Sequence, residues 1–358
     1  MAGLTLAFSG SSKPGSTLLL PGALMPPDWL TASEREQLRA LPGLRRLDRE
    51  AEVESEYAAD GPAPIEPGHE HWLRQRFGID AQESVAAAAV QAEGEAQAQW
   101  RLEPVYFRLA RDHLVLTDPI GLALAPEEAL QLAAAVLPVF EAEGLRLRAS
   151  GVSRWSLSAS GTQAALALTT PSLAGAIGRN IEVWLPSGPD ARRWRKLLNE
   201  VQMTWYEHPV NTQRADSGRP PVNGLWIEGR VPATADRSLA ACALQLAREP
   251  SRSSEARPIP LEANDSLHID TALLDAVYAG DARGWIQAWN GLNARWLDAS
   301  STRVDTLRPL RHIVFAGDSG WRSTRLRQTA RWWPLPSLRR TDWLALPGQS
   351  GVHPPQTR

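Results

Sequence analysis

The sequence predicts an α/β protein whose core is interrupted by an inserted α+β module. An apolar run at residues 16–20 ends at Pro21-Gly22, as a buried strand does. Residues 105–157 place runs of strand length on both sides of a long helical pattern, which is typical of an α+β module. Residues 178–230 then carry a short apolar run, an amphipathic helix, a polar loop and a further apolar run.

Length and composition set the outer limits. The chain has 358 residues, of which 43% are hydrophobic and 22% charged, and this length accommodates roughly two domains. A net charge of −2 gives no whole-molecule attraction to nucleic acid or to anionic membranes. Cys242 is the only cysteine, so an intrachain disulfide and a cysteine zinc site are excluded. The sequence shows no signal peptide and no membrane-length apolar window, so we expect a cytoplasmic protein without a membrane partner.

Residues 1–100 are expected to form the N-terminal half of the core. Ser33 and Glu36 have the spacing of a capping box, for a helix that Pro42-Gly43 ends. Further helices are expected over residues 72–77 and 85–98, after a connection rich in proline and glycine.

Four residues at the start of the 72–77 helix are potential metal ligands: Glu66, His69, Glu70 and His71. Histidine and carboxylate are common ligands of divalent metals. Because they follow an exposed connection, the favoured interpretation is that they are solvated residues at a helix start.

Residues 101–230 are expected to form the inserted module. Residues 105–109 and 113–116 predict a hairpin, with Asp112-His113 at its turn. Pro126 followed by two glutamates predicts a helix up to residue 143, since proline and acidic residues suit a first turn. Residues 145–147 and 155–157 predict the strands that follow.

Residues 178–230 carry most of the functional signal. A strand is expected over residues 181–184, and Asp190 is expected to cap a helix that reaches Glu207. His208 precedes a proline and so closes this helix, before a polar loop and a strand at residues 225–227. The buried stripe of the helix is predicted to consist of Trp194, Leu197, Leu198, Val201 and Trp205.

This segment also supplies the candidate ligand-binding residues. The guanidinium groups of Arg179, Arg214 and Arg219 could together hold a phosphate or a carboxylate, which they match bidentately. The alternative is that the polar side chains satisfy backbone groups of the loop, which would otherwise be buried without partners. The two interpretations are compatible and both stay open. The candidates are Arg179, Asn180, Asn199, Gln202, His208, Asn211, Arg214, Arg219 and Asn223.

Residues 231–265 are expected to form a linker region that includes a helix or strand at 239–248. Residues 266–346 are expected to form the tryptophan-rich C-terminal half of the core, with helices capped by Asp270 and Asp281. Strands are expected at residues 313–315 and 321–326. Residues 347–358 are expected to be a disordered tail.

The C-terminal segment suggests a different function. Residues 301–358 contain ten arginines and three aspartates, interleaved with Trp321, Trp332, Trp333 and Trp343. Arginines between aromatic platforms are typical of single-stranded nucleic-acid binding. The favoured alternative is that the acidic residues 31–70 face this segment within the fold.

Residues 207–230 resemble the signature of archaeal-type cofactor-independent phosphoglycerate mutases, members of the alkaline-phosphatase superfamily. The matching positions are His208, Pro209, Val210, Asn211, Arg214, Gly218, Pro221, Asn223 and Trp226. Residues 114–160 resemble a second module of that family, with Arg154-Trp155 where the family has tyrosine-arginine. Residues 41–54 resemble the family's second helix, so the resemblance implies a helix there. The chain thus looks like the bacterial branch labelled RpfE-type regulatory protein. The resemblance implies a shortened alkaline-phosphatase-superfamily-like core with the module inserted between its halves.

Active members of this family use two divalent ions and a serine nucleophile. The resemblance places a metal-binding aspartate after the first strand, where this chain has Gly22, and the nucleophile region has no counterpart. His268, Asp270 and Asp318 are the nearest remnants of metal ligands.

We therefore expect no metal or other cofactor, and we identify no catalytic residue. The resemblance implies a catalytically degenerate protein that acts in regulation or binds a ligand. Expected partners are a small anionic or phosphorylated ligand, or a protein. One alternative is an active mutase, an isomerase with divalent metal as its cofactor; the second is the nucleic-acid-binding protein.

Overall fold

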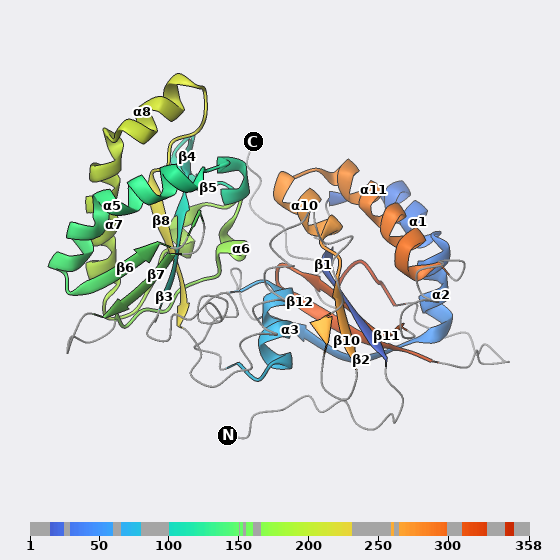
Figure 1. Ribbon diagram of the computed structural model, residues 1–358. Helices are drawn as coiled ribbons and strands as arrows, with labels where there is room; N and C mark the ends of the chain where they lie inside the picture. Colours follow the sequence, from blue (N-terminus) through green and yellow to red (C-terminus); the bar gives the residue numbers. More distant parts are fainter. Residues whose placement is uncertain are drawn as a thin grey trace. The chain divides into compact units, whose positions relative to one another are not determined.

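The fold was obtained as a computed structural model, which describes residues 15–24, 29–59, 66–79, 100–149, 151–152, 155–159, 166–230, 259–260, 265–298, 310–327 and 341–346. It is a mixed α/β structure of two compact units (Figure 1). The first unit comprises residues 1–73 and 242–358, and the second comprises residues 74–241. In the described part, no helix has both the length and the apolar character that spanning a membrane requires.

The first unit is built on a six-stranded sheet. Its order is β2-β12-β11-β1-β10-β9, and β1 is parallel to both of its neighbours while the other pairs are antiparallel. The strands are β1 (Ser16–Leu24), β2 (Ala51–Ala58), β9 (Ile259–Pro260), β10 (Ser266–Ile269), β11 (Leu310–Gly317) and β12 (Gly320–Leu326).

Four helices and a π-helical turn pack on one face of this sheet. Leu18 and Leu20 of β1 and Phe315 of β11 form a core with leucine and tryptophan side chains of these helices. Burying such side chains is the main favourable term in folding. The elements are α1 (Ala32–Arg39), α2 (Pro42–Glu50), α10 (Ala272–Ala279), α11 (Ala282–Leu292) and η6 (Asn293–Leu297). A further helix, α3 (Gly68–Arg76), follows β2 in the sequence.

Three predictions for the first half of the core are wrong. Pro21-Gly22 does not turn the chain, because β1 continues to Leu24 with a shift of register after Leu20. The capping box of α1 is formed by Thr31 and Glu34, two residues earlier than expected, since Thr31 is the last extended residue. Residues 51–54 are a strand and not the end of a helix.

The strand β2 was missed because its glutamates suggest a helix surface. Glu52, Glu54 and Glu56 of β2 pair with Arg327, Arg325 and Arg322, which lie in β12 or directly after it. The pairing register shifts at Glu54, so Glu56 and Arg322 lie on one face of the sheet while Glu52 and Arg325 lie on the other. Cross-strand ion pairs thus hold the edge of the sheet.

The second unit contains a four-stranded antiparallel sheet of order β6-β7-β3-β8. Its elements follow in the order strand, helix, strand, strand, helix, strand, which is the ferredoxin-like arrangement. Both helices pack on one face, where Trp155, Trp194 and Trp205 are buried. The elements are β3 (Trp100–Val105), α5 (Pro126–Ala142), β6 (Leu145–Ala149), β7 (Trp155–Ala159), α7 (Ala191–Tyr206) and β8 (Gly224–Arg230).

Shorter elements complete the second unit. The predicted hairpin is confirmed as β4 (Phe107–Ala110) and β5 (His113–Leu116), with Asp112 and His113 at its turn as expected. The helix η2 (Pro119–Leu122) precedes α5, and α6 (Leu173–Ala176) precedes η3 (Ile181–Trp184).

Two predictions for residues 178–230 are corrected. Residues 181–184 form the 3-10 helix η3 and not a strand, because the side chain of Asn180 accepts a hydrogen bond from the Glu182 amide and caps it. The expected polar loop begins with a helix, α8 (Pro209–Asp216). The helix over 191–206, its buried stripe and the strand containing residues 225–227 are confirmed.

In the C-terminal half, the two helices and both strands are confirmed as α10, α11, β11 and β12, and Asp281 caps α11 as expected. The predicted cap of α10 is wrong by one residue: its N-cap is Thr271, although Asp270 Oδ1 accepts from the Ala272 amide at 3.1 Å. Strand β10 was not predicted. Several predicted segments lie outside the described residues: 85–98, 239–248, 249–258 and 347–358, together with Arg154, Trp332 and Trp333.

Candidate functional site

Three of the candidate ligand-binding residues, His208, Asn211 and Arg214, lie on α8 or cap it in the second unit. His208 is the N-cap of α8, and its Nδ1 accepts a hydrogen bond from the Val210 amide at 3.2 Å. An Nδ1 that accepts is unprotonated. Burial lowers the pKa of His208, which favours this neutral state. His208 therefore follows the end of α7 and begins α8.

Asn211 fastens α8 to its neighbours. Its Nδ2 donates to the carbonyl oxygens of Trp205 and Val222, and its Oδ1 accepts from the Val222 amide, each at 2.8 Å. The side chain is buried. These bonds tie the end of α7 to the segment that enters β8, which is the structural role considered above.

Arg214 is fully buried, with all three nitrogens bonded inside the fold. Its Nε donates to the Pro220 carbonyl at 2.8 Å, its Nη1 to Glu128 Oε2 at 2.7 Å, and its Nη2 to the Leu122 carbonyl. Its donors are therefore occupied by the protein. Arg219, which is 40% exposed, donates to the other oxygen of Glu128 at 2.9 Å.

Glu128 is the carboxylate that both arginines share. Burial alone would raise the pKa of Glu128, but the Ala125 amide, Arg214 and Arg219 together lower it. Glu128 also bonds the Ala125 amide at 3.0 Å and so begins α5. The guanidinium groups of Arg214 and Arg219, which were expected to bind phosphate, therefore bind the carboxylate of Glu128.

The remaining candidates divide into anchored and exposed side chains. Asn223 exchanges two hydrogen bonds with the backbone of Phe107, at 2.7 and 3.0 Å, and so joins β8 to the hairpin. Arg179 lies over the indole of Trp184, 5.3 Å from the ring centre. Asn199 is exposed, and Gln202 is half-buried on the same helix.

A second group of interest lies at the carboxyl end of β1, where open α/β sheets bind ligands. Gly22 has a φ of +77°, and a Cβ built on it would lie 2.9 Å from the Leu274 amide nitrogen. Its carbonyl accepts a hydrogen bond from Trp285 Nε1 at 2.7 Å. Helices α10 and α11 thus close the position at which the resemblance places a metal-binding aspartate.

The remnant ligands on β10 are committed to the fold. Asp270 accepts from Arg295 Nη2 and Trp296 Nε1, both at 2.8 Å. His268 packs against Trp296 with ring centres 5.2 Å apart, and burial lowers its pKa. In the described residues, no three histidine, cysteine or acidic side chains gather closely enough to hold a metal ion. Among the described residues, the donor set therefore does not fit the dinuclear metal site of the resembled family.

The residues at the start of α3 are buried, so the prediction of a solvated helix start is wrong. His69 and Glu70 are each 2% exposed. His71 bonds Glu66 at 3.0 Å and stacks on Tyr57 with ring centres 3.7 Å apart. Gly68 permits this burial, since a Cβ there would overlap the Gly320 carbonyl of the β11–β12 turn. Burial lowers the pKa of His69 to about 4.

A buried charge cluster in the second unit was missed. Arg101 of β3 donates to Glu103 and, at 3.1 Å, to Glu228 of β8. Burial and then the charge of Asp118 raise the pKa of Glu103, against the opposing effect of Arg101. Glu228 also accepts from the Leu173 amide at 2.6 Å. The sequence signal for this strand was the alternation of Arg101 and Glu103 with apolar residues. Pro104 argued against a strand here, because proline is uncommon inside a sheet.

The basic C-terminal segment is partly neutralised within the fold. Arg322, Arg325 and Arg327 pair with the glutamates of β2, so the acidic segment faces these arginines as the favoured alternative predicted. Trp321 and Trp343 are buried and are not exposed platforms for bases.

Comparison with known proteins gives a short sequence match. No family model matches the chain. The 2,3-bisphosphoglycerate-independent phosphoglycerate mutases of Methanosarcina mazei and Methanosarcina barkeri are each 32% identical over 53 residues. That stretch is 15% of this chain and 13% of each relative's length.

Solved structures with a similar course of chain come from two archaea. The cofactor-independent phosphoglycerate mutase from Thermoplasma acidophilum aligns with 89% of this chain and 91% of its own, at 15% identity and a TM-score of 0.36. The PH0037 protein from Pyrococcus horikoshii aligns with 89% of this chain and 88% of its own, at 13% identity and a TM-score of 0.40.

Proposed function

We propose that this protein is a phosphoglycerate mutase-like protein of the RpfE-type regulatory branch that no longer transfers phosphoryl groups. It acts by binding a small anionic or phosphorylated ligand. The observation that carries the proposal is the packing of Gly22 against the Leu274 backbone, because it leaves no room for a metal-binding side chain at the end of β1.

The chemistry of phosphoryl transfer explains why this position matters. Two divalent ions hold the attacking and leaving oxygens, and their ligands must be carboxylates or imidazoles available to the metal. Asp270 instead neutralises Arg295 and bonds Trp296. The motif His208, Asn211 and Arg214 that supports the family resemblance serves internal hydrogen bonds.

Ligand binding is assigned to the accessible candidates beside α8. Arg219 is 40% exposed and follows α8, His208 is half-buried at the start of α8, and Gln202 is half-buried on α7. Arg219 shares Glu128 with Arg214, so an anion would compete for one guanidinium that is already partly solvated. Exposed pairs of this kind contribute little to stability and are readily exchanged.

The loss of catalysis is tested by metal analysis of the purified protein and by an assay of 2- and 3-phosphoglycerate interconversion with added manganese. An archaeal mutase serves as the positive control. We expect no stoichiometric metal and no turnover above the blank. Turnover that disappears on chelation would establish the active-mutase alternative.

The binding surface is tested separately by calorimetric titration with inorganic phosphate and with 3-phosphoglycerate. Arg219→Met should weaken binding, whereas Arg192→Met, which removes an exposed arginine from α7, should not. Equal losses of affinity in both variants would mean that the anion responds to the overall positive charge and not to Arg219 in particular. Undiminished binding by Arg219→Met would remove this surface from the proposal.

A further inference from the structure

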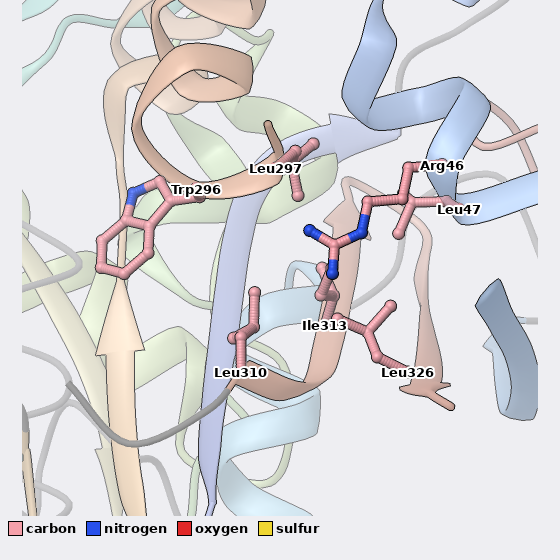
Figure 2. Close-up of a pocket in the computed structure, with 7 residues that line it drawn as sticks. All are labelled: Arg46, Leu47, Trp296, Leu297, Leu310, Ile313 and Leu326. Carbon is pink, nitrogen blue, oxygen red and sulfur yellow. The ribbon is translucent and has the colours of Figure 1, made fainter. Parts of the chain in front are cut away.

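A small apolar pocket lies in the first unit and includes Trp296 in its lining. Its volume is about 110 Å³. It is bounded by α2, η6 and the strands β11 and β12, and Figure 2 shows its walls. The lining residues are Arg46, Leu47, Trp296, Leu297, Leu310, Ile313 and Leu326.

Arg46 is the one charged side chain of this lining. Its Nε donates to Glu50 Oε2 at 2.6 Å, which fixes the plane of the guanidinium. Nη1 and Nη2 have no hydrogen-bond partner among the residues that the structure describes. In Figure 2 these two nitrogens point from α2 toward Leu297 and Ile313. The Arg46 side chain is 32% exposed, so Nη1 and Nη2 lie at a solvent-accessible mouth of the pocket, where they are available to an anion.

The walls of the pocket are held by interactions outside it. Asn293 Oδ1 accepts from the Gly43 amide at 2.7 Å, which joins η6 to α2. A Cβ at Gly43 would lie 2.3 Å from Leu297 Cβ, so glycine permits this close approach. Trp296 is fixed through its Nε1 by Asp270. The pocket is therefore formed before any ligand arrives, which lowers the entropic cost of binding.

We propose that this pocket binds a short apolar carboxylate, whose hydrocarbon chain fills the cavity and whose carboxylate meets Nη1 and Nη2 of Arg46. The planar guanidinium matches a carboxylate in a bidentate pair. An engineered apolar cavity of about 150 Å³ holds benzene, so this volume suits a body of about five carbon atoms. A ligand such as hexanoate has this form.

The site is independent of the proposed loss of phosphoryl transfer. Leu310 begins β11, which is parallel to β1, and Leu326 ends β12, which is antiparallel to β11. Both residues therefore lie near the amino end of β1, at the opposite end of the strands from its carboxyl end. Trp296 lines the pocket and bonds Asp270, but the charged group that would bind the carboxylate, Arg46, takes no part in the contacts of Gly22 or Asp270. Either proposal can fail without the other.

The test is calorimetric titration of the full chain with hexanoate, 1-hexanol and acetate. We expect saturable binding of hexanoate and much weaker binding of the other two, which lack the charge or the hydrocarbon chain. Arg46→Met keeps the apolar stem and should weaken hexanoate binding about tenfold or more, as expected for a charge-assisted pair. Hexanoate should also raise the melting temperature of the native chain.

Two variants separate binding from folding. Arg45→Met removes an exposed arginine from the same helix and should leave hexanoate binding unchanged. Leu310→Trp, at the half-buried rim, should occlude the cavity and abolish binding while the circular dichroism spectrum is preserved. Equal affinity for hexanol and hexanoate, full affinity in Arg46→Met, or no binding by the native chain would each overturn the proposal.

Discussion

Arg214 Nη1 donates to Glu128 Oε2 at 2.7 Å, and this arginine is fully buried while Glu128 is 14% exposed. The pair joins α8 to the start of α5, two helices far apart in sequence. Arg219 approaches the same carboxylate from the solvent side. One acidic residue therefore serves one internal and one external guanidinium, which provides a matched pair for mutation.

Replacing Arg214 should destabilise the second unit far more than replacing Arg219. Arg214→Met leaves Glu128 and two backbone carbonyls without their buried donor, and breaking such a pair costs about 3–5 kcal/mol. Arg219→Met removes a partly solvated contact worth about 1 kcal/mol or less. Urea unfolding followed by fluorescence and circular dichroism measures both. Equal effects would contradict the internal role of Arg214.

Asn211 offers a second test of internal hydrogen bonding. Asn211→Ala should lower the free energy of unfolding by about 1–3 kcal/mol, because the Val222 amide and two carbonyls lose their buried partner. Asn199→Ala, on an exposed face of α7, should change it by less than about 0.5 kcal/mol. The comparison uses urea midpoints, and a loss of stability at Asn199 as large as that at Asn211 would count against it.

Periodic segments were predictable from the sequence because burial and local pattern agree in them. Helix α7 shows this: Trp194, Val201 and Trp205 recur at helical spacing and all three are buried. Proline before two glutamates likewise located the start of α5. In these elements the apolar face alone decides which side packs.

Other elements depend on partners distant in sequence, and these were missed. β2 is a strand because its glutamates meet arginines of β12, more than 250 residues away. His69 is buried because Gly68 lets α3 approach the β11–β12 turn closely. The hydrogen-bond partners of Asn211 and Arg214 likewise could not be deduced from spacing, because they include Leu122, Glu128 and Val222.

Gly22 should not tolerate a side chain. Gly22→Ala places a Cβ against the backbone of α10 and forces a positive φ on a residue that disfavours it, which should cost about 2 kcal/mol or more. Gly280→Ala is the control, since its φ is also positive but no atom lies within 4 Å of the added Cβ. That variant should lose only about 1 kcal/mol. Thermal unfolding distinguishes steric overlap from backbone strain.

Gly22→Asp addresses the proposed function directly. If α10 closes this position, the added carboxylate destabilises the fold and does not create manganese affinity. The measurement is manganese binding by calorimetry beside a melting curve. A stable variant that binds manganese would show that the end of β1 can still accept a metal ligand.

The stability of the first unit should fall in mild acid because of His69. Its pKa in the folded state is about 4, since burial disfavours the imidazolium, whereas an unfolded histidine titrates near about 6.5. Below that unfolded pKa the unfolded chain binds a proton that the folded chain does not. The contribution of His69 to the free energy of unfolding is therefore fully present above about pH 6.5 and decreases as the pH falls. It is lost by about pH 4, which lowers the free energy of unfolding by about 3 kcal/mol.

His69→Gln removes this titration while keeping a polar side chain of similar length. Urea unfolding at intervals between about pH 4 and 7 should show a shallower acid limb in the variant than in the native chain. Part of the slope should persist, because burial lowers the pKa of His208 and His268 as well. If the free energy of unfolding fell equally steeply with pH in the two proteins, the prediction would be wrong. His69 would then have the same pKa in the folded and the unfolded chain.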